Sequence, residues 1–98
     1  MEIGCDCVST LLEIRNAFPN TNIYGNELNP NSAHTTSHFA TVTVNNIENY
    51  NLPYPPNMFD YIIFGDVLEH LYNPYKTVEY CKTLLKETRH SNFFQKEK

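Results

Sequence analysis

The 98-residue sequence contains no tryptophan, only three glycines and only three cysteines. An odd number of cysteines does not make the disulfide framework of a small secreted domain. No apolar run approaches the roughly 20 residues that a membrane-spanning helix needs, so we expect no membrane partner. Seven basic residues against eleven acidic ones argue against a nucleic-acid-binding surface, which normally displays clustered Lys and Arg.

The residues that are present favour one small globular domain. Hydrophobic residues make up 41% of the chain and aromatic residues 13%, which is typical of a protein with a buried core. A chain of this length forms at most one domain. Met1 is followed by strand-like residues instead of a basic and apolar leader, so no signal peptide is predicted and the cytoplasm is the expected location.

Apolar periodicity predicts strands that alternate with helices. Asn29 followed by Pro30 is typical of a helix start, and the continuous apolar run at residues 61–64 is typical of a strand buried on both faces. Strands are expected at residues 1–3, 21–28, 41–44 and 61–64, and helices at about 10–18, 30–39 and 74–85. No clear period is found at residues 87–98, which we interpret as an irregular tail.

This alternation predicts an α/β fold with a parallel sheet. Ligands of such sheets bind beyond the carboxyl ends of the strands, so the residues at those ends are candidates for a binding site. Besides Glu2 to Asp6, they are Glu27, Asn45, Asn46, Gly65 and Asp66.

Glu27 is the candidate with the most specific spacing. It follows Gly4 by 23 positions, close to the distance of about 20 at which an acidic side chain binds a ribose diol in strand–glycine–helix units. A carboxylate suits this role because it accepts hydrogen bonds from both hydroxyl groups. Taken alone, Glu27 would be interpreted as a solvated loop acid, but the preceding unit favours the ribose role.

Three stretches resemble motifs of class I S-adenosylmethionine-dependent methyltransferases of the small-molecule type. "EIGCDCVS" resembles the first motif, an acidic residue followed by Gly-x-Gly-x-Gly, and "IYGNELNP" resembles the second. "NNIENYNLPYPPNMFDYIIFGDVLEHL" resembles the long third stretch, in which Leu-Pro, Phe-Asp and Leu-Glu-His occur in this order. The resemblance extends from Met1 to about Lys86 and depends mainly on the third stretch.

The resemblance implies a truncated Rossmann-like parallel sheet with flanking helices, about four strands of a seven-stranded fold, over residues 1–86. It also implies S-adenosylmethionine as cofactor: Glu2 and Gly4 at its methionine end, Glu27 at the ribose, and Asn46 at the adenine amino group with Ile47 against the ring. The implied cofactor-binding residues are Glu2, Gly4, Cys5, Asp6, Glu27, Leu28, Asn46, Ile47, Gly65 and Asp66.

The sequence departs from the family pattern within this site. Asp6 and Val8 stand where the first motif has glycines, and Asn46 stands where the family has an aspartate. An asparagine still accepts a hydrogen bond through its amide oxygen, but without the added strength of a charged acceptor. Together these departures predict weakened or absent cofactor binding.

His70 is the candidate catalytic base, needed only when the acceptor must lose a proton. The alternative is a hydrogen-bonded residue at a helix entry. In some members of the family a carboxylate–Glu–His cluster here holds a divalent metal, with Asp66 and Glu69 as the further candidates in this chain. We regard this ligand set as partial and predict no metal.

The sequence leaves alternatives open for the partners and the activity of this chain. A small-molecule acceptor fits the resemblance, but the acceptor-binding half of the family fold is largely absent. The fourth strand would expose an unpaired edge, which predicts self-association or a partner chain. The alternative to an enzyme is a non-catalytic, degenerate remnant or binding module of the same fold. A nicotinamide-binding Rossmann unit would share the role of Glu27 but does not explain the third stretch.

Overall fold

The computed structural model describes residues 1–4, 8–89 and 92–95. Its strands form one parallel sheet in the order β3-β2-β1-β4-β5. The strands are β1 (Glu2–Ile3), β2 (Tyr24–Glu27), β3 (Thr41–Val44), β4 (Ile62–Phe64) and β5 (Phe93–Gln95). The helices are α1 (Val8–Ala17), α2 (Pro30–Thr36) and α3 (Pro74–Leu84), with short 3-10 helices η1 (Ile47–Asn49), η2 (Leu68–His70) and η3 (Glu87–Arg89).

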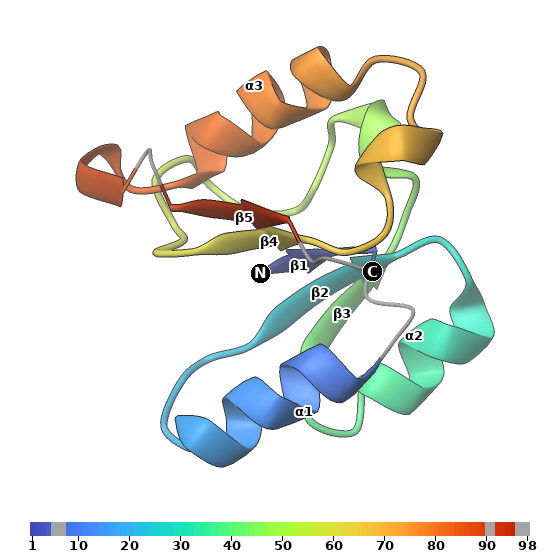
Figure 1. The fold of residues 1–98 in the computed structure, drawn as a ribbon, viewed down its shortest axis with the longest axis vertical. Coiled ribbons are helices and arrows are strands. Elements are labelled where there is room, and N and C mark those ends of the chain that lie inside the picture. Colours follow the sequence, from blue (N-terminus) through green and yellow to red (C-terminus); the bar gives the residue numbers. More distant parts are fainter. Residues whose placement is uncertain (5–7, 90–91, 96–98) are drawn as a thin grey trace.

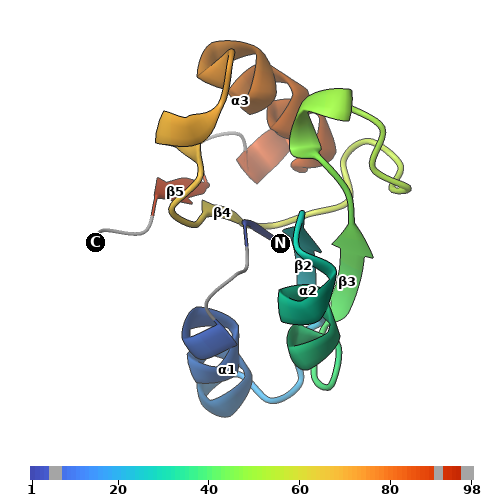
Figure 2. The ribbon, with the colours of Figure 1, turned by 90° about the vertical axis from the view of Figure 1, so that its right-hand side faces the viewer.

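The helices cover the sheet from two sides. Helix α3 lies over one face, and α1 and α2 lie under the other (Figures 1 and 2). All neighbouring strands are parallel, so each connection between them crosses over a face of the sheet. This arrangement confirms the predicted α/β fold with a Rossmann-like parallel sheet.

The start of α2 follows the predicted capping chemistry, whereas α1 begins at Val8, two residues before its predicted start. The Asn29 side chain accepts hydrogen bonds from the backbone N–H groups of Asn31 and Ser32, at 2.9 and 3.3 Å, and Pro30 is the first residue of α2. Asn73 caps α3 in the same way by accepting from Lys76 N at 3.0 Å. Helix α2 ends at Thr36, three residues before the predicted end at Phe39.

The larger hydrophobic core lies between the sheet and α3. Ile3, Ile62 and Phe64 from the strands pack there with Cys81 and Leu84 from the helix, all 3% exposed or less. Burial raises the pKa of the Cys81 thiol to about 12, so this cysteine is a structural apolar residue, as the sequence predicted. Cys5 and Cys7 lie outside the described residues. A smaller core of Leu11 and Ile23 lies between α1 and the sheet.

The prediction of an irregular tail over residues 87–98 is wrong for its middle part. Residues Phe93–Gln95 form β5 and pair with all three residues of β4. The Asn92 side chain supports this pairing by donating to the carbonyl of Asp60 at 3.0 Å. Strand β4 therefore has a neighbour on both sides, and the open edge expected there is not found. Aromatic residues favour strands, but two adjacent ones did not produce a recognisable alternating pattern.

Phe93 and Phe94 give a matched pair for testing how β5 is held. Phe93 packs on the core beneath α3, with its ring centroid 5.9 Å from that of Phe64, whereas Phe94 is 51% exposed on the opposite face. We expect Phe93→Ala to lower the free energy of unfolding by about 2 kcal/mol, since the side chain is only partly buried, and Phe94→Ala by about 0.5 kcal/mol at most. Urea denaturation measures both. Equal losses would contradict this orientation of β5.

A groove of about 910 Å³ lies beside α1. Its walls include Phe18, Tyr61, Ile63 of β4 and Phe94 of β5. The large exposed apolar side chains in this groove are Phe18, Tyr61 and Phe94. Within the described residues, no helix is long and apolar enough to cross a membrane.

Candidate functional site

The carboxyl ends of four strands meet at one edge of the sheet. Ile3 is in register with Asn26 on β2 and with Phe64 on β4. The next backbone bonds continue this alignment past the strand ends: Gly4 N donates to Asn26 O, and Gly65 N donates to Ile3 O, both at 2.8 Å. Asn45 N donates to Glu27 O at 3.1 Å, which brings the end of β3 to the same edge. The segments that carry Gly4, Glu27, Asn46 and Asp66 are therefore adjacent, as the parallel sheet predicted.

Two glycines allow β1 and β4 to approach closely at this edge. A Cβ atom on Gly65 would lie 2.4 Å from the carbonyl oxygen of Gly4, a distance at which no side chain fits. Gly4 has φ +74°, in the left-handed region that favours glycine, and a Cβ there would lie 3.0 Å from Cβ of Val67. These positions require glycine for packing and backbone conformation, independently of any ligand.

Glu27 is positioned at the end of β2 with one oxygen already engaged. Its side chain is 6% exposed, and Oε2 accepts a hydrogen bond of 2.7 Å from the backbone of Asn29. Within the described part of the chain, Oε1 accepts no hydrogen bond. The carboxylate is therefore oriented by the start of α2, and Oε1 is the oxygen available to a hydroxyl group.

Asn46 and Ile47 take different places although they are neighbours. Asn46 is exposed and is the N-cap residue of η1, where its Oδ1 accepts from Glu48 N at 3.0 Å. Ile47 is 4% exposed and belongs to the core under α3, so its contact with an adenine ring stays a prediction.

The remaining predicted cofactor residues differ in how exposed they are. Glu2 is 1% exposed, so it lies within the sheet layer beneath the site. Leu28 is 67% exposed, and Asp66 is also exposed. Cys5 and Asp6 fall outside the described residues, so their predicted contacts stay predictions.

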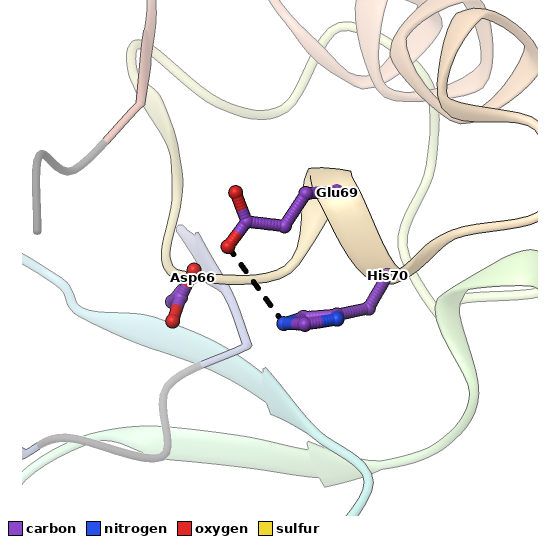
Figure 3. A group of neighbouring side chains, drawn as sticks. All are labelled: Asp66, Glu69 and His70. Carbon is purple, nitrogen blue, oxygen red and sulfur yellow. Dashed lines mark ion pairs between the residues drawn. The ribbon is translucent and has the colours of Figure 1, made fainter.

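His70 lies in a cluster with two carboxylates. Figure 3 shows Asp66, from the loop after β4, beside Glu69 and His70 from η2. One ligand atom of each residue lies within 4.8 Å of the others, and His70 Nε2 is 3.7 Å from Glu69 Oε1. All three residues are exposed, and exposed acidic groups commonly lie close together without an ion. The cluster places a proton acceptor at the same edge as Gly65.

The sequence did not single out Glu48, which ties two parts of this edge together. Its two carboxylate oxygens accept from the backbone N–H groups of Tyr72 and Asn73, at 3.2 and 3.1 Å. These bonds connect η1 to the loop that leads from His70 into α3. An isolated glutamate in an asparagine-rich loop carries no sequence signal for such a contact, because its partners are 24 and 25 residues away.

Two cavities among the described residues lie away from this edge. The groove beside α1 and a smaller cavity of about 280 Å³ near Arg15 and His38 are lined by none of the predicted site residues. His34 and His38, which the sequence placed one helical turn apart, have ring centroids 5.3 Å apart. His38 Nδ1 lies 3.1 and 3.0 Å from the carbonyl oxygens of His34 and Thr35, so this ring nitrogen hydrogen-bonds to the backbone near the end of α2.

A parallel sheet of order 3-2-1-4-5, with glycines and a carboxylate at its carboxyl edge, defines a Rossmann-like α/β domain. A family model described as "methyltransferase domain" matches residues 1–88. The chain therefore belongs to the methyltransferase domain family, within class I. A search of curated proteins finds no match.

Solved structures confirm the fold at low sequence identity. A putative methyltransferase of Haloferax volcanii, in complex with the Trm112 methyltransferase activator, has a TM-score of 0.74 at 16% identity, over 87% of this chain and 39% of that chain. The [4+2]-cyclase SpnF has a TM-score of 0.67 at 18% identity, over 87% of this chain and 34% of that chain. The plantazolicin methyltransferase BpumL is in complex with a desmethyl analogue and S-adenosylhomocysteine (SAH). It has a TM-score of 0.63 at 22% identity, over 86% of this chain and 32% of that chain. The chain thus spans between 32% and 39% of the length of these structures.

Proposed function

We propose that this chain binds S-adenosylmethionine at the carboxyl edge of its sheet and forms the cofactor-binding part of a methyltransferase with a small-molecule acceptor. The observation that carries the proposal is the position of Glu27 at the end of β2, next to the strand end that carries Gly4, with its Oε2 held by Asn29 N and its Oε1 available. Family membership and the SAH in the BpumL structure support the choice of cofactor.

Each residue at this edge would have a distinct task. Gly4 and Gly65 allow β1 and β4 to approach closely at their carboxyl ends, and a ligand would meet the backbone of both strands there. Glu27 Oε1 would accept a hydrogen bond from the ribose, and Asn46 would meet the base. Glu2, buried beneath, would position the loop that begins at Gly4.

Methyl transfer requires alignment more than acid–base chemistry. The cofactor supplies a methyl group already activated by its sulfonium centre. The chain would hold the acceptor atom in line with that methyl group, and such positioning is a main source of rate acceleration. For an acceptor that must lose a proton, His70 is the base that we propose, oriented by Glu69 at 3.7 Å.

We further propose that transfer requires residues in addition to those of this sequence, because the chain covers 39% of the Haloferax structure that it resembles. The Haloferax methyltransferase, in complex with an activator, is a precedent for association within this fold. The alternative is a non-catalytic binding module. SpnF has the same fold and is a [4+2]-cyclase, so the fold by itself does not establish methyl transfer.

Isothermal titration calorimetry tests the proposed cofactor directly. We expect the purified chain to bind S-adenosylmethionine and SAH, with a dissociation constant in the micromolar range or weaker because of the altered first motif. NAD serves as the comparator, since it offers the same adenosine without the methionine end. Stronger binding of NAD would support a nicotinamide site, and the absence of heat from all three ligands would support the degenerate alternative.

A further inference from the structure

The side chain of Asn46 has a fixed orientation at the proposed base-binding edge. Its Oδ1 accepts a hydrogen bond from Glu48 N at 3.0 Å. A backbone N–H can only donate, so the atom that faces it must be the amide oxygen and not the nitrogen. Nδ2, with its two hydrogens, therefore lies on the other side of the amide group, and no described residue accepts a hydrogen bond from it.

The backbone around Asn46 is held on both sides. On one side, Asn45 N donates to Glu27 O at 3.1 Å. On the other, Ile47 is buried in the core, and the Glu48 carboxylate binds the N–H groups of Tyr72 and Asn73. Rotating the amide to present its oxygen would break the cap of η1 and place two N–H donors against each other. The Nδ2 donor of Asn46 is thus held in place by the fixed backbone on both sides of this residue.

We infer that Asn46 reverses the hydrogen-bonding polarity of the base-binding position, so that this site prefers a purine with a carbonyl oxygen where adenine has its amino group. This inference rests on the proposed function. An aspartate at position 46 would cap Glu48 N with one oxygen and offer the other as an acceptor for an amino group. The asparagine caps in the same way but offers a donor, which meets an acceptor favourably and an amino group unfavourably.

A four-way comparison tests this preference. The natural chain and Asn46→Asp are each titrated with SAH and with S-inosylhomocysteine, in which oxygen replaces the adenine amino group. We expect the natural chain to bind the inosyl compound about fivefold more tightly, and Asn46→Asp to bind the adenosyl compound about fivefold more tightly, as expected for one hydrogen bond at an exposed position. The preference should therefore change sign between the two proteins.

Asn49→Asp is the matched control, because it adds the same charge to the same 3-10 helix without changing the cap residue. It should keep the preference of the natural chain, and a reversed preference in Asn49→Asp would show that charge alone decides, which overturns the inference. Tighter binding of SAH than of the inosyl compound by the natural chain would also overturn it while leaving the proposed function intact. If neither compound binds to any of the three folded proteins, the proposed function fails, and this inference fails with it.

Discussion

Glu27→Gln is expected to lower the affinity for SAH by about tenfold or more, because a hydrogen bond to a charged acceptor contributes about 1.5–3 kcal/mol. The substitution is nearly isosteric and keeps an oxygen that can accept from Asn29 N, so the start of α2 should be preserved. The loss should therefore appear in binding and not in folding. Calorimetry gives the affinity, and thermal denaturation gives the stability of the same sample.

Glu13→Gln provides the control for this experiment. Glu13 is exposed on α1, and its replacement removes the same charge without touching the carboxyl edge of the sheet. We expect its affinity for SAH to equal that of the natural chain. A loss of similar size in both variants would indicate a general effect of net charge, and unchanged binding in Glu27→Gln would remove Glu27 from the proposed ribose contact.

Gly65→Ala is expected to lower the free energy of unfolding by about 3 kcal/mol, at the upper end of the usual cost of overpacking. The new methyl carbon would lie 2.4 Å from Gly4 O, and a backbone atom cannot rotate away as a side chain can. For a domain of this size, the change corresponds to a decrease in melting temperature of about 12–24 °C. Differential scanning calorimetry measures this decrease.

Gly4→Ala makes a useful comparison with Gly65→Ala. Its new methyl carbon would meet the side chain of Val67 at 3.0 Å, and φ +74° adds a conformational cost of about 1–2 kcal/mol. Val67→Gly removes the Cβ atom that the new methyl carbon meets, so the costs of Gly4→Ala and Val67→Gly should be less than additive in the double variant. No second side-chain substitution should rescue Gly65→Ala, and such a rescue would contradict the close backbone approach of β1 and β4.

The sequence predicted the elements that local chemistry defines. Asn29–Pro30 and the β-branched residues 41–44 gave the start of α2 and the bounds of β3, because capping and strand propensity act within a few residues. The alternation of strands and helices was sufficient for a parallel sheet. Since parallel strands end at one edge, the adjacency of the Gly4, Glu27, Asn46 and Asp66 segments followed from the same pattern.

Other features depend on residues distant in the chain and were not predictable. Strand β5 exists because Phe93 packs against the core and Asn92 reaches the carbonyl of Asp60, 32 residues away. The two hydrogen bonds that the Glu48 carboxylate accepts likewise join two segments that no short motif connects. For this reason, the expected open edge of β4 and the irregular structure expected at residues 93–95 were both wrong.

By itself, the sequence determined the fold class, the family and the strand ends at which a ligand would bind, since these depend on periodicity, capping and local motifs. Only the tertiary structure decided which atoms at those ends are available. Burial removed Ile47 and Glu2 from the surface, and hydrogen bonds engaged one oxygen of Glu27 and the oxygen of Asn46. A side-chain polar atom can be assigned to a ligand only after its bonds to the rest of the protein are known.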